Sequence, residues 1–248
     1  MNKKLLKGIS SPLANRGPED IDFLVVRENT EGEYSNTGGR LFENSERECV
    51  VQESIFTRTG VDRIIRYACE LALQRPAKHL TSATKSNGIS YTMPFWDERF
   101  AEVGADYPEL RRDQYHIDIL CAHFVQHPDW FDVVVGSNLF GDILSDLGPA
   151  IAGGIGIAPS ANLNVDRSFP SMFEPVHGSA PDIAGKGIAN PFAAILTAGM
   201  MLEYLGRPDA HTRIQGAVQA CLLADQVTPE LGGTLSTSAV GDAILARL

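Results

Sequence analysis

Apolar positions along the chain alternate between short β-branched runs and longer segments with helical spacing. Residues 21–26, 79–83 and 131–135 are runs typical of buried strands. Apolar residues recur at helical spacing over residues 61–72 and 117–125. Because strands and helices alternate in this way, the pattern predicts an α/β sandwich with a largely parallel sheet.

The remaining elements are predicted from the residues that start and stop them. A further strand fits residues 49–56, and a helix from about Leu139 to Leu147 should be stopped by Gly148 and Pro149. The next helix has Asn190 as its cap and Pro191 at its first position, and two more helices fit residues 211–225 and 238–248. A Gly- and Pro-rich stretch, residues 153–164, predicts a boundary between domains at 1–152 and 153–248.

Charge and composition exclude several classes of partner. The 248 residues carry a formal net charge of -10, whereas nucleic acids and anionic membrane surfaces favour clustered Lys and Arg. The longest apolar stretch, residues 192–205, is too short to span a bilayer, and the amino terminus lacks the apolar core of a signal peptide. The four cysteines are widely separated, which favours reduced thiols in the cytoplasm.

The first candidate site is a pair of aspartates in a predicted helix. Asp142 and Asp146 are four residues apart, so both carboxylates project from one face and could hold a hard cation such as Mg²⁺ or Mn²⁺. By spacing alone, a solvated helix surface is the more common case. The apolar neighbours predict that much of this helix is buried, and unpaired buried carboxylates are costly. A metal ion would supply the missing positive charge.

Other candidates follow predicted strands, where α/β folds commonly place functional loops. Arg27 could bind a substrate carboxylate through two hydrogen bonds, or it could pair with a nearby glutamate. Tyr34 could exchange a proton or be an ordinary packed tyrosine. Lys85 lies in the loop after residues 79–83 and is a candidate functional residue, although an ordinary surface lysine is the more common case. Judged by itself, Asp118 is predicted to be a half-buried aspartate whose hydrogen bonds are made within the protein.

The segment from Glu174 to Asp182 could bind an adenosine group. Its small residues permit close approach of a ligand to the backbone, His177 can stack on a base, and Asp182 can accept hydrogen bonds from ribose hydroxyls. The alternative, a turn-rich surface loop, is the more common case for such a composition.

Three long motifs resemble the isocitrate and isopropylmalate dehydrogenase family of decarboxylating dehydrogenases, over essentially the whole chain. The motifs are residues 27–34 (Arg-Glu-Asn-Thr-Glu-Gly-Glu-Tyr), 138–146 (Asn-Leu-Phe-Gly-Asp-Ile-Leu-Ser-Asp) and 174–186. Within the family, residues 81–88, 93–98 and 116–120 are most similar to the tartrate and D-malate branch. The resemblance implies an isopropylmalate dehydrogenase-like α/β/α sandwich, with a substrate and dimerisation domain over residues 1–152 and part of an NAD-binding domain over residues 153–248.

The resemblance also implies a role for each matching residue. Arg27 would bind a substrate carboxylate, and Tyr34 would protonate the enol after carbon dioxide leaves. Asp142 and Asp146 would coordinate Mg²⁺ or Mn²⁺ with Asp118 of the neighbouring subunit, which would also supply Lys85 as the base. The residues expected to contact NAD are Asn87, His177, Gly178, Ser179, Ala180, Asp182 and Asn190.

The resemblance implies oxidative decarboxylation of a small 2-hydroxy diacid, D-malate or tartrate, by a homodimer with shared sites. Isocitrate and isopropylmalate are the alternative substrates. Family members have a further segment of about 100 residues, the size of a small domain, before the position of Met1. The fold is therefore expected to be incomplete at the amino terminus. A rival hypothesis is a non-catalytic family member that dimerises without turning over substrate.

Overall fold

The protein, described by a computed structural model over residues 2–248, forms two compact units. One unit is Leu24–Leu144, and the other combines Ser145–Leu248 with the chain up to Phe23. These divisions fall within a strand and a helix. The boundary predicted between residues 152 and 153 separates the chain by role, and it stays a prediction.

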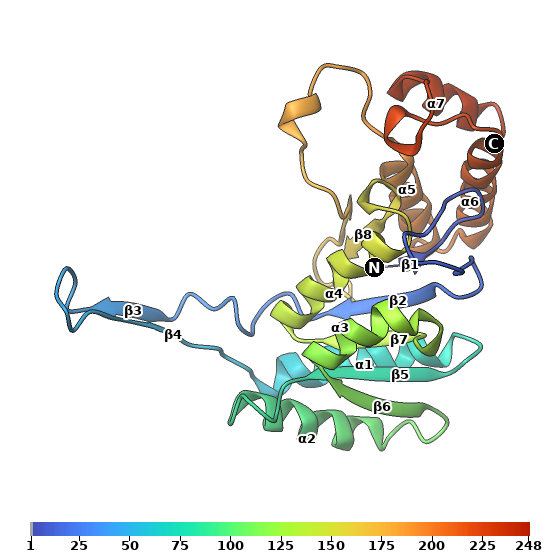
Figure 1. Cartoon of the computed structure of the whole chain (residues 1–248). Helices are drawn as coiled ribbons and strands as arrows, with labels where there is room; N and C mark the ends of the chain where they lie inside the picture. Colours follow the sequence, from blue (N-terminus) through green and yellow to red (C-terminus); the bar gives the residue numbers. More distant parts are fainter. Residues whose placement is uncertain (1) are drawn as a thin grey trace. The chain divides into compact units, whose positions relative to one another are not determined.

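The central sheet has five strands in the order β1-β2-β7-β5-β6 (Figure 1). These strands are β1 (Asn2–Lys4), β2 (Asp22–Arg27), β7 (Val133–Gly136), β5 (His79–Thr84) and β6 (Arg111–His116). β2 and β5 each pair in parallel with β7, and β5 also pairs in parallel with β6. The predicted α/β fold with a largely parallel sheet is therefore confirmed, and the carboxyl ends of these four strands share one edge.

Helices cover the sheet within the unit Leu24–Leu144. α1 (Arg58–Leu73) packs against α2 (Thr92–Gly104) and against β5 and β7, and α3 (Ile117–Gln126) contacts β5 and β6. Figure 1 shows α3 in front of the sheet and α1 behind it. The short helix η1 (Pro128–Trp130) leads into β7, whose valines are fully buried between these layers. The indole of Trp96 is buried as well, and its Nε1 donates a hydrogen bond of 2.9 Å to Ser82 Oγ.

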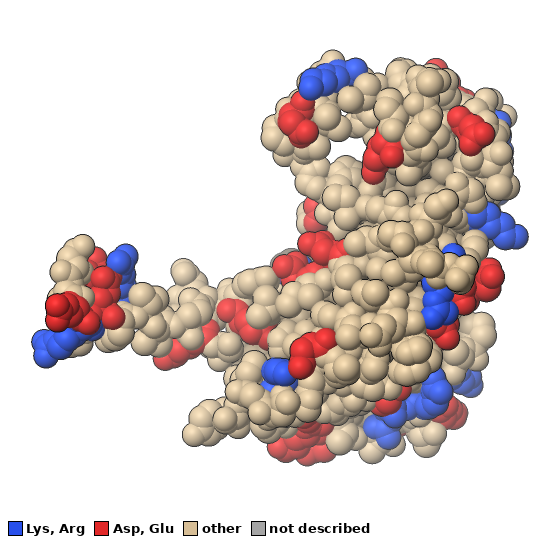
Figure 2. All heavy atoms as spheres, viewed as in Figure 1, with Lys and Arg blue, Asp and Glu red and all other residues tan. Residues whose placement is uncertain are grey.

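A two-stranded hairpin projects from this unit (Figure 1). Its antiparallel strands are β3 (Gly38–Leu41) and β4 (Cys49–Gln52), and every residue in them is exposed. The predicted strand at residues 49–56 is thus shorter, because after Gln52 only an isolated bridge between Ile55 and Gly32 continues the pairing. Figure 2 shows charges of both signs gathered at the hairpin tip, which includes the ion pair of Arg40 with Glu48.

Helix α4 (Asn138–Ile151) carries both candidate metal ligands and extends beyond its predicted end at residues 148 and 149. Pro149 lies inside its last turn, where a missing N–H costs only one helical hydrogen bond. Ala152 N–H still donates to the carbonyl oxygens of Gly148 and Pro149. The proline therefore ends the helix within three residues rather than stopping it at once.

The second unit packs helices around one apolar core. Its elements are η2 (Ile155–Ile157), β8 (Pro159–Asn162), β9 (Met172–Pro175), η3 (Pro181–Ile183), α5 (Phe192–Tyr204), α6 (Pro208–Leu223), η4 (Pro229–Leu231) and α7 (Thr237–Leu245). Phe192, Val218 and Val240, from three of these helices, are fully buried in that core. β8 and β9 pair antiparallel.

In the described residues no helix is both long and apolar enough to cross a membrane.

Two smaller predictions have a structural outcome. All four cysteines are free thiols, as their spacing predicted. The helix predicted to have Asn190 as its cap instead has Pro191 at that position. Asn190 Oδ1 still accepts a hydrogen bond of 3.0 Å from Phe192 N–H, so its side chain serves the same helix from one residue further out.

Candidate active site

The candidate residues of the first unit follow the carboxyl ends of parallel strands. Arg27 is the last residue of β2, and it pairs in register with Gly136, the last residue of β7. Helix α4 starts two residues later, so its first turn lies beside Arg27. Lys85 follows β5, and Asp118 lies in the first turn of α3, directly after β6. This edge is where open α/β sheets place their ligands.

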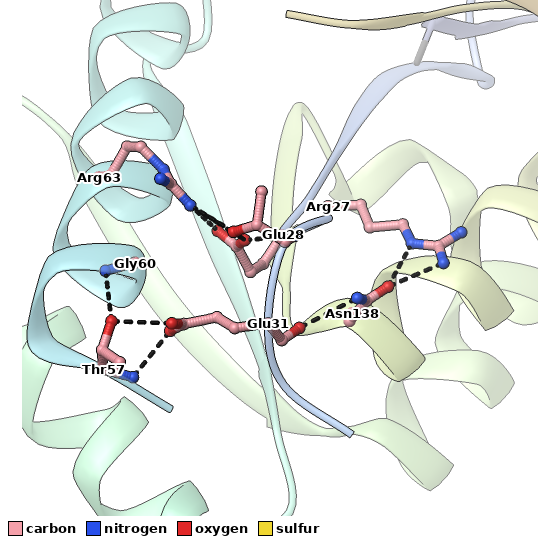
Figure 3. Close-up of polar contacts among 8 residues, drawn as sticks. Arg27, Glu28, Glu31, Thr57, Gly60, Arg63 and Asn138 are labelled. Carbon is pink, nitrogen blue, oxygen red and sulfur yellow. Dashed lines mark hydrogen bonds and ion pairs between the residues drawn. The ribbon is translucent and has the colours of Figure 1, made fainter. Parts of the chain in front are cut away.

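Arg27 is held by two residues of α4. Its Nε and Nη2 donate hydrogen bonds of 3.0 and 2.8 Å to Asn138 Oδ1 (Figure 3). Its Nη1 forms an ion pair with Asp142. The side chain of Arg27 is only 18% exposed. In the part of the chain that the structure describes, Arg27 is paired with no glutamate of the following turn, so that alternative is not the one adopted.

Those glutamates have other partners. Glu28 is buried and accepts hydrogen bonds from Thr30 and Arg63, and Glu31 accepts two hydrogen bonds of 2.8 Å from Thr57 at the start of α1. Both contacts are drawn in Figure 3. Three carboxylates close to Arg27 in sequence are thus used to fasten the turn, which leaves the guanidinium to α4.

The third of these carboxylates, Glu33, caps helix α4. It accepts hydrogen bonds of 2.6 Å from Ser137 Oγ and 3.0 Å from Leu139 N–H. An anionic cap satisfies a free N–H and complements the positive end of the helix dipole. Sequence reasoning missed both Glu33 and Asn138 as site residues. Their presence in the motifs at residues 27–34 and 138–146 is the one signal that could have found them.

Tyr34 lies against the same aspartate. Its hydroxyl donates a hydrogen bond of 2.9 Å to Asp142 Oδ2, and the Arg27 guanidinium carbon lies 5.8 Å from the centre of its ring. The hydrogen bond to Asp142, together with partial burial, raises the pKa of Tyr34 above its ordinary value. A phenol with an ordinary pKa is already protonated at neutral pH, and this shift makes its proton harder to remove. More than half of Tyr34 is exposed.

Lys85 and Asp118 form a second pair. Lys85 Nζ lies 2.7 Å from Asp118 Oδ1, and the hydrogen bond from Lys85 lowers the pKa of Asp118. The sequence alone predicted a half-buried Asp118. In the structure Asp118 is exposed, and its carboxylate is paired with Lys85. Among the described residues, the hydrogen bonds of Lys85 go to Asp118 and that of Tyr34 goes to Asp142. The predicted base and the predicted acid thus belong to different groups of contacts within one chain.

The two candidate metal ligands on α4 are less buried than predicted. Asp146 is exposed and Asp142 is half-buried, while Phe140 and Leu144 form the buried side of the helix. Within residues 2–248 no three His, Cys, Asp or Glu side chains are arranged to hold a metal ion. The carboxylate oxygens of Asp142 and Asp146 are donors that suit Mg²⁺ or Mn²⁺, so these residues fit part of such a site. A third carboxylate would have to come from outside this group, as the prediction for Asp118 requires.

The predicted adenosine-binding residues lie on an exposed loop of the second unit. Gly178, Ser179, Ala180 and Asp182 are exposed, and His177 is half-buried with Nδ1 at 2.9 Å from Gly178 O. Asn190 Nδ2 is buried and has no partner in the described structure. A buried donor without an acceptor is costly, and an acceptor atom of a ligand would satisfy the Asn190 amide. Asn87, the remaining predicted contact, is exposed in the turn after β5.

The fold and the residues at this sheet edge define a dehydrogenase of one family. A model of the family described as isocitrate/isopropylmalate dehydrogenase matches residues 2–244. The chain belongs to that family, which confirms the resemblance and the enzyme class predicted from the three motifs.

The chain is also similar to individual members of this family. The chain is 61% identical over 246 residues to D-malate dehydrogenase [decarboxylating] of Escherichia coli (strain K12), covering 97% of this chain and 68% of that protein. It is also 61% identical over 254 residues to tartrate dehydrogenase/decarboxylase of Pseudomonas putida, covering 99% of this chain and 70% of that protein. The solved structure of isocitrate dehydrogenase from Methylococcus capsulatus superposes with a TM-score of 0.91 at 37% identity, covering 99% of this chain and 71% of that one.

Proposed function

We propose that the protein carries out NAD-dependent, divalent-metal-dependent oxidative decarboxylation of a small 2-hydroxy diacid of the D-malate or tartrate type. The observation that carries the proposal is the contact of Asp142 with both Arg27 and Tyr34, since the proposed reaction needs a guanidinium, a carboxylate for a metal ion and a phenol side by side. The 61% identity to enzymes named for D-malate and tartrate supports this substrate class over isocitrate and isopropylmalate.

Each residue has a defined task in that reaction. Arg27 binds a carboxylate of the diacid, and Lys85 takes the proton of the hydroxyl group as the carbon beside it is oxidised to a ketone. The bond to the carboxylate β to that ketone then breaks, carbon dioxide leaves and an enolate remains. Tyr34 delivers the proton of its hydroxyl to the enolate carbon. When bound, Mg²⁺ or Mn²⁺ at Asp142 and Asp146 would polarise the hydroxyl and the ketone, and NAD would accept the hydride.

The cofactor in this proposal is NAD rather than NADP. Asp182 is exposed on the adenosine-binding loop, where its carboxylate would accept hydrogen bonds from a ribose and repel a 2′-phosphate. The buried Asn190 amide would donate to the adenine, and Asn87 would contact the nicotinamide. Free, widely separated thiols favour the reducing cytoplasm as the place of action.

The active unit in this proposal is a homodimer in which Lys85 and Asp118 of one subunit complete the site of the other. Two features support it. Lys85 and Tyr34 belong to separate groups of contacts, and the projecting hairpin leaves Leu41, Phe42 and Val50 more than half exposed. Apolar side chains on an unpaired hairpin are typical of a surface that another chain covers.

A reduction assay tests the proposal. Reduction of NAD is followed with D-malate, tartrate, isocitrate and isopropylmalate, each with Mn²⁺ and after treatment with a chelator. We expect turnover of D-malate or tartrate that stops without metal and returns when Mn²⁺ is added. Preference for isocitrate or isopropylmalate would replace the substrate assignment, and a folded protein that turns over none of the four would favour the non-catalytic alternative.

A further inference from the structure

We propose that Asn138 is a positioning residue that aims the guanidinium of Arg27 at a substrate carboxylate without neutralising its charge. The inference rests on the proposed function, in which Arg27 binds the diacid. Asn138 is 6% exposed and lies at the first position of α4, and its amide joins Arg27 to the turn that follows β2 (Figure 3).

Asn138 holds one edge of the guanidinium, and Asp142 is paired with Nη1 at the other edge. Arg27 Nε and Nη2 lie on one edge, and both donate to the single oxygen Oδ1 of Asn138, at 3.0 and 2.8 Å. A guanidinium has five N–H donors, so one N–H on Nη1 and one on Nη2 remain beyond the contacts with Asn138 and Asp142. The edge formed by Nη1 and Nη2 is the one that can bind a carboxylate with two parallel hydrogen bonds. Asn138 thus fixes the orientation of that edge.

The orientation of the Asn138 amide is itself fixed. Its Nδ2 donates a hydrogen bond of 3.0 Å to the main-chain oxygen of Glu31. A flipped amide would set an oxygen against the Glu31 carbonyl and an NH₂ group against the Arg27 donors, which loses all three hydrogen bonds. Because Glu31 is fastened through Thr57 to the start of α1, the amide is supported by a helix on each side.

The backbone leaves room for this arrangement at one glycine. A Cβ at Gly141 would lie 2.6 Å from both Cβ and Cγ of Arg27, closer than real side chains approach. The absence of that Cβ lets the Arg27 side chain lie against the first turn of α4, within reach of Asn138. The oxygen of Asn138 is neutral, so it adds no second carboxylate beside Asp142 to compete with the substrate for the guanidinium.

Kinetics of Asn138→Ala give the first test. We expect KM for the diacid to rise about tenfold, the loss expected for one charge-assisted hydrogen bond, while kcat changes by less than about threefold. In an Arg27→Ala background the same substitution should leave KM unchanged, because there is no guanidinium to orient. Ser236→Ala, which removes the cap of α7, is the matched control and should lower the unfolding temperature with KM unchanged. Equal effects of Asn138→Ala in both backgrounds would overturn the proposal.

A second measurement does not depend on activity. In protein labelled with ¹⁵N at arginine, the Arg27 Nε–H signal, identified by its loss in Arg27→Lys, should exchange slowly with water. In Asn138→Ala it should exchange at least about tenfold faster. Asn138→Ser, whose hydroxyl is too short to reach both donors, replaces the alanine variant if that one does not fold. Unchanged exchange would overturn the positioning role, whereas failure of the unsubstituted protein on every diacid would instead reject the proposed function.

Discussion

At the scale of single residues, Arg27 is paired with only some of the acidic side chains around it. Its turn contains three glutamates, yet each of them is fastened to a helix or a hydroxyl elsewhere. The remaining acidic partner is Asp142, which also accepts the hydrogen bond of Tyr34. A carboxylate shared by a guanidinium and a phenol holds both groups close to the place where it would bind a metal ion. Asp142 therefore connects the residues proposed to bind the substrate, hold the metal ion and donate the proton.

The substitution Tyr34→Phe tests the role of the phenol. The ordinary pKa of a tyrosine lies well above neutral pH, and the hydrogen bond to Asp142 raises the pKa of Tyr34 further, so its hydroxyl carries the proton that the proposed reaction needs. Removing it should lower kcat by about 10²–10⁴-fold with little change in KM, as expected for the loss of a general acid. Steady-state rates with the preferred diacid measure this. Tyr91→Phe, at an 88% exposed tyrosine beside α2, is the control and should keep full activity, and a Tyr34→Phe enzyme of normal kcat would refute the assignment.

The sequence motifs pointed to residues that the structure brings into contact, but they did not point to residues whose contacts lie far away in sequence. Asp142, Arg27 and Tyr34 were named from the sequence, and the structure brings the three together. Asn138 and Glu33 were not named, because their partners lie more than 100 residues away in sequence. No rule of local spacing connects an amide at the start of one helix with a guanidinium at the end of a distant strand.

At the scale of elements, the parallel sheet gives its two edges different tasks. The carboxyl edge carries the candidate site, and the opposite edge carries a network at the starts of β5 and β6. His79 is 2% exposed, with Nε2 at 2.8 Å from Asp113 Oδ2 and Nδ1 at 2.7 Å from Arg111 Nη2. Because Arg111 can only donate, His79 Nδ1 accepts and Nε2 carries the proton that bonds to Asp113. The network ties the two strands together by side chains as well as by their ladder.

The Asp113→Asn substitution should change how stability depends on pH. Burial alone would raise the pKa of Asp113, but hydrogen bonds from His79 and Thr81 outweigh it and lower the pKa. A carboxyl whose pKa is lowered by folding stabilises the folded state at pH values above its pKa in the unfolded chain, about 3.9. This stabilisation is lost as the pH falls through the pKa of the carboxyl in the folded state. We expect Asp113→Asn to reduce the free energy of unfolding by about 1–2 kcal/mol at pH 6 and by less at pH 3. Urea unfolding across this range measures it.

Glu109→Gln is the control for that experiment, since Glu109 is an exposed carboxyl outside the network. Its free energy of unfolding should follow that of the unsubstituted protein at each pH. If Asp113→Asn followed the same curve, displaced by a constant amount or not at all, the network would not stabilise the fold through a charged Asp113.

Element boundaries show how far sequence patterns reach. The parallel strands β2, β5 and β7 and the helices α1 and α3 were predicted from their apolar patterns. Strand β6 and helix α2 were not predicted, and β6 consists of polar and aromatic residues with no apolar run. Helix α4 runs past its predicted stop because a proline in the last turn removes a single hydrogen bond. The hairpin of β3 and β4 is exposed on both faces, so it lacks the alternation that marks a half-buried strand, and only part of it was predicted.

At the scale of the whole molecule, the sequence places the acid and the base of the proposed reaction in one chain, but the structure groups them separately. Tyr34 and Asp142 form one group, and Lys85 and Asp118 form the other. Two subunits related by a two-fold axis could bring the first group of each beside the second group of its partner, which creates two equivalent sites per dimer. Sequence alone could not derive this sharing from spacing, because it depends on how two surfaces meet.

Mixing inactive variants distinguishes shared sites from sites contained in one chain. Lys85→Ala and Asp142→Asn are each expected to be inactive, and they are unfolded and refolded together so that subunits exchange. If sites are shared, a mixed dimer has both defects in one site and an intact second site. Activity should then return to about one quarter of the unsubstituted value, because half of randomly formed dimers are mixed and each has one working site of two.

The matched control mixes Tyr34→Phe with Asp142→Asn. These two residues are in contact within one chain, so every site in a mixed dimer carries one defect and activity should stay at the level of the separate variants. Recovery with the first pair and none with the second supports sites built from two subunits, with Lys85 on the opposite subunit from Tyr34 and Asp142. No recovery with either pair, in refolded dimers of confirmed mixed composition, would place Lys85 in the same subunit as Asp142.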